Sequence, residues 1–316
     1  MTAALAAVGF PHWHFHPDVW LLVVVLEGAF LLAMRRERAR RGPGADPPVS
    51  AGQVAAFTGG VVALWLASDW PVHDLAEGYL YSVHMVQHLV MTLVAALLLV
   101  AGTPGWMARR LLKPRAVMAT VRFLARPVPG LIQFNTVMVL SHWPEVVEAT
   151  VRFHALHFVA HAVLLVSAVL MWLPVVSNLP EVPRLPPMLR MMYLFLQTII
   201  PTVPASFLTF GTKPLYPIYA EFPRLWGISA LDDQLVAGLI MKVGAGFYLW
   251  IVIATIFFRW YNSEERDEQA ARAARRSGEP VKPTSDDVLT WAKVEEEFER
   301  LDSQRAHPSG PSGGAT

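Results

Sequence analysis

Seven long apolar stretches constrain this chain more than any other feature of its sequence. A helix needs about 20 apolar residues to cross the hydrocarbon core of a membrane. Only 16% of the residues are charged, whereas soluble domains carry about 25%. We therefore predict an all-α fold, a polytopic membrane bundle of seven transmembrane helices. The predicted spans lie at about residues 17–35, 53–70, 82–102, 128–143, 155–175, 189–210 and 233–258.

Basic residues are distributed unequally between the two ends of these predicted spans. Arginine and lysine gather after the first, third, fifth and seventh spans, while the opposite loops carry few. Cytoplasmic loops of membrane proteins are enriched in these residues. The pattern predicts an N-terminus outside the cell and a C-terminus in the cytoplasm. The opposite loops hold only Arg152, Lys213 and Arg224.

Composition also predicts two domains. Residues 1–262 hold all seven apolar stretches and form the predicted membrane domain. Residues 263–316 form a predicted cytoplasmic tail, which is rich in charged residues. Within the tail, residues 285–300 place apolar side chains along a narrow stripe at helical spacing, as expected of one short amphipathic helix.

The histidines are concentrated on one predicted side of the membrane. Of the eleven histidines, only His307 falls in the predicted cytoplasmic tail. If histidines served only as interfacial residues, they would be scattered over both faces. Their concentration predicts a functional site at the outer face. The ten histidines there are His12, His14, His16, His73, His84, His88, His142, His154, His157 and His161.

Spacing selects a smaller set among them. His84 and His88 are four residues apart, so their side chains share one helical face. The fifth predicted span opens with three histidines at i, i+3 and i+7, again on one face, and His142 ends the fourth span. We predict one four-imidazole site or two smaller ones, with these candidate metal ligands: His84, His88, His142, His154, His157 and His161.

Two adjacent carboxylates, Asp232 and Asp233, begin the seventh predicted span on the same side. They could orient ligand imidazoles through the second ring nitrogen. They could instead cap the helix that they begin, because carboxylates bind free N–H groups at helix N-termini. Both roles are compatible, and the sequence does not separate them.

The chain contains no cysteine, which excludes thiolate metal sites and cysteine-based catalysis. Imidazole is a good ligand for copper, zinc and haem iron. No phosphate-binding loop, nucleic-acid motif or catalytic nucleophile set is recognisable. We therefore predict a protein that is not an enzyme and does not bind nucleic acid.

Several sequence blocks resemble one protein family. The run from His84-Met-Val-Gln-His88 to Gly102-Thr-Pro104 resembles the HxxQH…GxP signature of the seven-span CtaG family. Three further blocks, within 12–260 and in the expected order, resemble other parts of that family. They are Ser141-His-Trp-Pro144, His157-Phe-Val-Ala-His161 with Trp172-Leu-Pro174, and Leu215-Tyr-Pro-Ile-Tyr219 with Leu231-Asp-Asp-Gln234.

This resemblance implies a membrane assembly factor for bacterial cytochrome c oxidase. It implies a location in the bacterial cell (inner) membrane. It also implies that the clustered histidines bind copper and hand it over at the outer membrane face. The expected partners are oxidase subunits, a copper donor protein and the lipid membrane. Two alternatives stay open, namely a haem-binding membrane redox protein with bis-histidine ligation and a copper transporter.

Overall fold

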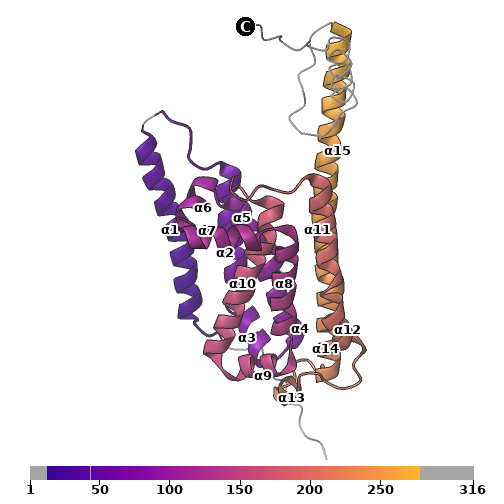
Figure 1. Ribbon diagram of the computed structural model, residues 1–316. Coiled ribbons are helices and arrows are strands. Elements are labelled where there is room, and N and C mark those ends of the chain that lie inside the picture. Colours follow the sequence, from indigo (N-terminus) through magenta and orange to yellow (C-terminus); the bar gives the residue numbers. More distant parts are fainter. Residues whose placement is uncertain (1–12, 43, 278–316) are drawn as a thin grey trace, which may run out of the picture. The chain divides into compact units, whose positions relative to one another are not determined.

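The computed structural model describes residues 13–42 and 44–277, and every regular element in that part of the chain is a helix (Figure 1). The predicted all-α class is confirmed. The chain divides into two compact units, residues 1–258 and 259–316. The predicted amphipathic helix at residues 285–300 lies outside the described residues.

Within the described residues, six helical segments are long and apolar enough to cross a membrane. Each corresponds to one of the predicted spans, and several consist of consecutive helices with a short break or a π-helical turn. They are α1 (Pro17–Arg41), α2 (Ala51–Ser68) with α3 (Val72–Gly78), α4 (Tyr81–Leu89) with η1 (Val90–Ala95) and α5 (Ala96–Gly102), α10 (His154–Val176), α11 (Pro187–Ile199) with α12 (Thr202–Phe210), and α14 (Ala230–Leu239) with η2 (Ile240–Gly244) and α15 (Ala245–Ser277).

The fourth predicted span is built differently from the other six. It corresponds to α8 (Pro127–Ser141), which has 15 residues and meets α7 (Arg115–Leu124) at an angle of 87°. The break follows from Pro127, because proline pushes the residue before it out of the helical region, and Arg126 is extended with ψ of 151°. The part of the chain that the structure describes therefore has six candidate spans, or seven if this bent pair counts as one.

Close helix packing in the bundle depends on small residues. A Cβ atom added to Gly102 would lie 2.3 Å from the backbone nitrogen of Phe57, and one added to Gly60 would lie 2.9 Å from that of Leu99. Small residues let membrane helices approach closely where no hydrophobic force drives them together. These two glycines join α2 to α5.

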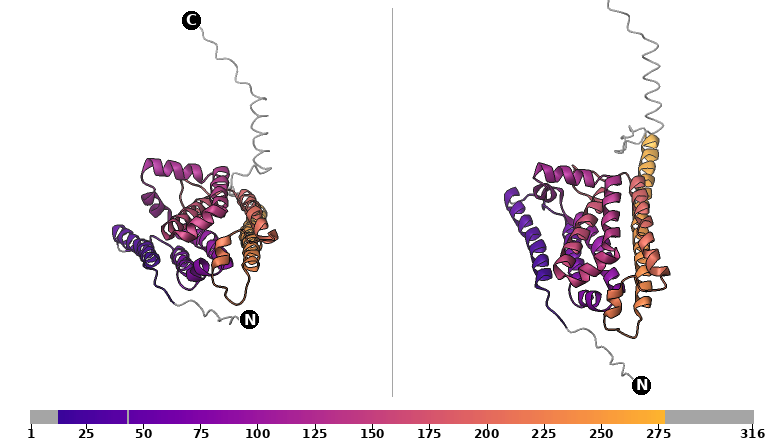
Figure 2. Two further views of the ribbon diagram at one scale, coloured as in Figure 1. Left: turned by 90° about the horizontal axis from the view of Figure 1, so that it is seen from below. Right: turned by 60° about the horizontal axis from the view of Figure 1, so that its bottom comes forward.

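Helix α1 lies at the edge of the bundle (Figure 2). Only Val19 and Phe30 of this helix are buried. The ring of Phe30 stacks on that of Phe57 in α2, with centroids 4.0 Å apart. The first span is thus attached to the rest mainly through α2.

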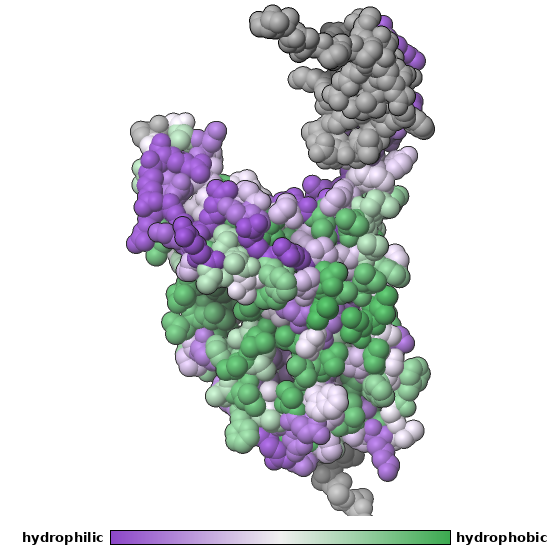
Figure 3. Space-filling model, in the orientation of Figure 1, coloured by the Kyte–Doolittle hydropathy of each residue, from purple (hydrophilic) through white to green (hydrophobic). Residues whose placement is uncertain are grey.

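The two ends of the bundle differ in composition. The arginine-bearing helices α6 (Gly105–Leu111) and α7 lie at one end, while α3, α9 (Pro144–Arg152) and α13 (Pro217–Glu221) lie at the other. Apolar surface separates the polar ends (Figure 3). Together with the candidate spans, this surface identifies a multi-pass membrane protein. The direction in which the bundle is inserted stays a prediction.

Two of the spans contain π-helical turns, η1 and η2. Such turns contain an extra residue and often occur at functional sites. Side chains from other helices bind carbonyl groups inside η1: Trp172 Nε1 donates to Thr92 O at 2.8 Å, and Tyr248 OH donates to Leu93 O at 3.1 Å. The extra residue of η1 lies directly after the helix that carries His84 and His88.

Candidate metal centre

Helix α4 is held at its first turn by a side chain from another span. The carboxylate of Asp233 accepts hydrogen bonds from the backbone N–H groups of Tyr81 at 2.7 Å and Ser82 at 3.0 Å. The first N–H groups of a helix have no partner within it, and the N-cap residue of α4, Leu80, has no side chain that could supply one. Asp233 therefore fixes the position of the helix that presents His84 and His88.

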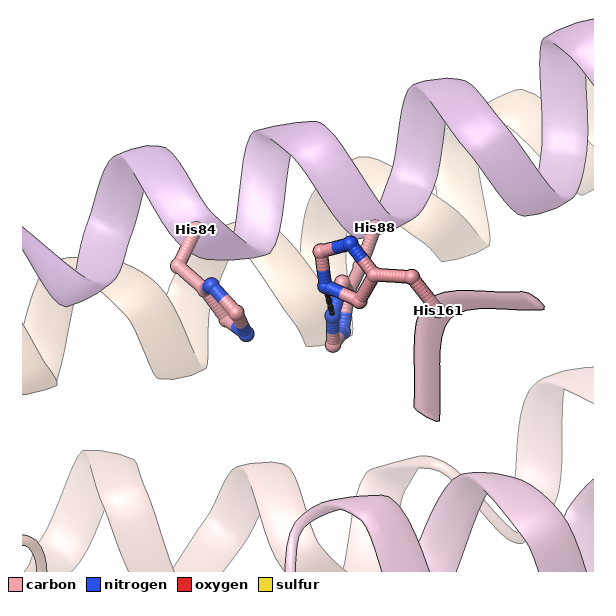
Figure 4. A group of neighbouring side chains, drawn as sticks. All are labelled: His84, His88 and His161. Atoms are coloured by element: carbon pink, nitrogen blue, oxygen red, sulfur yellow. Dashed lines mark hydrogen bonds between the residues drawn. The ribbon is translucent and has the colours of Figure 1, made fainter. Parts of the chain in front are cut away.

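Three imidazoles from two helices converge beyond this first turn (Figure 4). His84 and His88 extend from α4, and His161 reaches them from α10. Nε2 of His88 lies 3.0 Å from Nε2 of His161. One nitrogen from each of the three rings lies within 4.8 Å of the other two. We call this group the three-histidine site.

The site is buried and incompletely hydrogen-bonded. His84 and His88 are each 6% exposed, and the Nδ1 atom of each is buried with no hydrogen-bond partner in the described part of the chain. Buried polar atoms are rarely left without a partner. Ligands of one ion with bonds of about 2.0 Å lie about 3.3–3.6 Å apart, so small side-chain rotations would bring the three rings around one metal ion.

His142 lies beside the three-histidine site, with its ring centroid 5.7 Å from that of His88. Its Nδ1 donates to the carbonyl oxygen of Met138 at 2.7 Å, which leaves a lone pair on Nε2. That Nε2 lies 3.4 Å from the sulfur of Met85. An imidazole nitrogen and a thioether sulfur, both electron-pair donors, thus face each other next to the site.

Tyr216 positions His142 from the loop before α13. Its hydroxyl donates to the carbonyl oxygen of His142 at 2.8 Å. Burial raises the pKa of Tyr216 to about 12, so the hydroxyl keeps its proton and remains a donor throughout the physiological pH range.

His157 is one turn from His161 on α10, and their ring centroids are 4.0 Å apart. Its Nε2, however, lies 3.0 Å from the carboxylate of Glu77 in α3. His73, one turn before Glu77, belongs to the same group. The sequence pattern predicted His73 on the outer side, but neither His73 nor Glu77 was among the predicted metal ligands. The four-residue spacing of His73 and Glu77 was the available signal, because it puts both on one helical face.

The family comparison covers the residues that build this centre. The family described as cytochrome c oxidase caa3 assembly factor matches residues 28–263. The chain belongs to this family. The match includes α4, α10 and α14, and with them every residue of the three-histidine site.

A relative of this caa3 assembly factor family member occurs in Mycobacterium leprae (strain TN), where it is described as an uncharacterized protein. It is 26% identical over 277 residues, which are 81% of this chain and 40% of the relative. The chain thus spans less than half the length of that relative. No solved structure matches the chain.

Three of the predicted site residues in this family member lie away from the imidazole cluster. His154 is exposed at the start of α10, with Nε2 4.0 Å from the carboxylate of Asp18. Asp232 bonds Ser229 through both its backbone N–H and its carboxylate, at the start of α14. Asp233 acts on the three-histidine site through backbone N–H groups of α4, since its carboxylate accepts hydrogen bonds from Tyr81 and Ser82.

Proposed function

We propose that this member of the caa3 assembly factor family carries copper in the three-histidine site and hands it to a subunit of cytochrome c oxidase. The observation that carries the proposal is the convergence of His84, His88 and His161, with the Nε2 atoms of the last two 3.0 Å apart. Imidazole is a good copper ligand. Carrying a metal requires no covalent bond to be made or broken in a substrate, so the role is that of a chaperone rather than an enzyme.

The neighbouring Met85 and His142 support copper in its reduced form. Thioether sulfur is a soft ligand that favours Cu(I), and the Nε2 lone pair of His142 lies 3.4 Å from it. If both bound one copper ion, with Cu–N of about 2.0 Å and Cu–S of about 2.3 Å, the nitrogen and the sulfur would be about 3.5 Å apart. A path from the three imidazoles to this pair offers a release route by ligand exchange.

The predicted membrane orientation also supports hand-over outside the cytoplasm. The histidine-bearing end of the bundle is opposite the arginine-bearing helices α6 and α7, and arginine marks the cytoplasmic side. In the bacterial inner membrane, copper would then be received from a donor protein and delivered to the oxidase on the outer side.

The test measures copper in purified protein and oxidase activity in cells. The double substitution His84→Ala/His88→Ala should reduce copper bound per chain at least fivefold and reduce oxidase activity in cells, with partial recovery in excess copper. His154→Ala is the matched control, because His154 lies on the same helix as His161 but is exposed and away from the cluster; it should leave both measurements unchanged.

Two outcomes would contradict the proposal. Unchanged copper and unchanged oxidase activity in the double variant would remove the three-histidine site from this function. A haem Soret band in the purified protein that disappears on replacing His88 or His161 would instead favour the bis-histidine haem protein.

A further inference from the structure

A second group of potential ligands lies next to the three-histidine site. We propose that His73, Glu77 and His157 form a separate binding site for a divalent transition-metal ion such as Zn²⁺ or Cu²⁺. One ligand atom from each residue lies within 4.8 Å of the other two. This second site does not depend on whether the neighbouring three-histidine site carries copper.

The break between α2 and α3 brings these residues together. Helix α2 ends at Ser68 and α3 starts at Val72, so the short α3 presents His73 and Glu77 from adjacent turns. His157 comes from α10 and approaches the same carboxylate. Two imidazoles and one carboxylate are therefore contributed by segments more than 75 residues apart in sequence.

Polar contacts within the chain satisfy this arrangement only in part. Nε2 of His157 lies 3.0 Å from Oε1 of Glu77, which is an ion-pair distance, but the angles of this contact are not those of a good hydrogen bond. Nδ1 of His157 is buried without a hydrogen-bond partner among the described residues, and the whole residue is only 3% exposed. A cation between the nitrogen and the oxygen would satisfy both atoms at once.

The distances suit a shared metal ion. Glu77 Oε2 lies 3.4 Å from Nε2 of His73, and Oε1 lies 3.0 Å from Nε2 of His157. Ligands of a tetrahedral zinc ion, with bonds of about 2.0–2.2 Å, are separated by about 3.3–3.6 Å. The two separations between Glu77 and the histidines differ from these values by only a few tenths of an ångström, and every pair of ligand atoms lies within 4.8 Å.

Gln87 can hold His73 in the ligand tautomer. Its side-chain amide is fully buried and lies 3.3 Å from Nδ1 of His73. The atom that faces Nδ1 is the amide nitrogen of Gln87, and the amide oxygen is buried without a partner among the described residues. When Nε2 of His73 is bound to metal, Nδ1 carries the proton and can donate it to that oxygen after a flip of the amide. Metal-binding histidines commonly make such a hydrogen bond with their other ring nitrogen.

The ligand set distinguishes the second site from the first. A carboxylate oxygen with two imidazoles is harder than three imidazoles, and this combination suits divalent zinc or copper better than Cu(I). The Glu77 side chain is 28% exposed, so an ion could enter and leave. A role in loading the three-histidine site, through His157 and His161 on adjacent turns of α10, rests on the proposed function.

The test counts bound metal in the full-length protein purified in detergent. After chelator stripping, loading with excess Zn²⁺ and desalting, the unsubstituted protein should retain about two zinc ions per chain. Glu77→Gln and His73→Ala should each retain about one zinc ion, in the three-histidine site. His84→Ala/His88→Ala should also retain about one, in the site of His73, Glu77 and His157. Glu145→Gln, an exposed carboxylate on α9, is the matched control and should retain two.

Cobalt gives an independent readout of the same site. In the His84→Ala/His88→Ala background, bound Co²⁺ should give visible absorption bands that vanish when Glu77→Gln is added. Variants are compared only where elution from size exclusion and the unfolding temperature match those of the unsubstituted protein.

The outcomes separate this proposal from the proposed function. Two zinc ions retained in both Glu77→Gln and His73→Ala would overturn the second site. Loss of both ions from Glu77→Gln alone would overturn the independence of the two sites. Loss of metal only from the Glu77 and His73 variants would support the second site and defeat the three-histidine site.

Discussion

The carboxylate of Asp233 accepts the N–H groups of Tyr81 and Ser82, so one side chain on α14 fixes the start of the helix that carries His84 and His88. It is 1% exposed. Removing it would leave two backbone donors at a buried helix end without a partner, and each buried unpaired donor costs about 1–3 kcal/mol.

We expect Asp233→Ala to destabilise the protein by about 2–4 kcal/mol, measured by thermal unfolding in detergent. Its neighbour supplies the control, because Asp232 bonds only at the exposed start of its own helix. Asp232→Ala should cost about 1 kcal/mol or less. Equal unfolding temperatures for the two variants would contradict the capping role of Asp233.

Met85 permits a test of the soft ligand beside the imidazoles. Met85→Leu nearly conserves volume and should cost less than about 1.5 kcal/mol of stability. If the thioether is a Cu(I) ligand, affinity for Cu(I) should fall about tenfold, equivalent to about 1.4 kcal/mol, in competition with a chromophoric chelator. Met138→Leu removes a nearby buried methionine and should leave the affinity unchanged; an equal loss in both variants would argue against Met85.

At the residue scale, helical spacing predicted which faces of two spans carry imidazoles, but not how those imidazoles would be divided. His88 and His161 do meet. His157 turns instead toward His73 and Glu77, because the break before α3 directs those side chains back to the bundle. The three-residue break between α2 and α3 changes the direction of the chain, and the periodicity of the sequence does not predict that change.

At the scale of helices, the packing of α2 against α5 leaves room for a methyl group at some glycines and not at others. A Cβ at Gly102 would meet the backbone of Phe57 at 2.3 Å, whereas one at Gly52, also in this helix pair, would meet nothing within 4 Å. The first position can accept a methyl group only if the two helices move apart.

Gly102→Ala should therefore destabilise the protein by about 1–3 kcal/mol, as overpacking does, and lower its unfolding temperature. Gly52→Ala should be neutral or stabilising by up to about 1 kcal/mol, because alanine is the better helix former. If Gly102→Ala unfolds at the same temperature as Gly52→Ala, the close approach of α2 and α5 is wrong.

The six longest spans follow from hydropathy, since long apolar runs with few charged residues leave few other folds in a membrane. The fourth was harder to define. Its apolar run is short, and Pro127 separates α8 from α7 at 87°. The two helices reach the length and hydropathy of a span only when they are taken together.

At the scale of the whole molecule, the absence of cysteine makes insertion direction directly measurable. A single cysteine at Glu145 (α9) should react with a membrane-impermeant maleimide in intact cells. One at Ala116 (α7) should react only after the membrane is opened. Both positions are exposed. The reverse labelling pattern would invert the predicted orientation and place the histidines on the cytoplasmic side.

The π-helical turn η1 also affects how this chain should be aligned with relatives. One residue added to an ordinary helix rotates everything after it by about 100°, and the wider turn at Val90–Ala95 absorbs that rotation. A homologue with one residue fewer here could keep both the histidine pair before the turn and the packing of α5 after it. In an alignment, residues after Ala95 should therefore be paired with residues of a homologue that have the same neighbours in space, and not by counting from His88. A one-residue gap at η1 would mark an evolutionary deletion that leaves the fold unchanged.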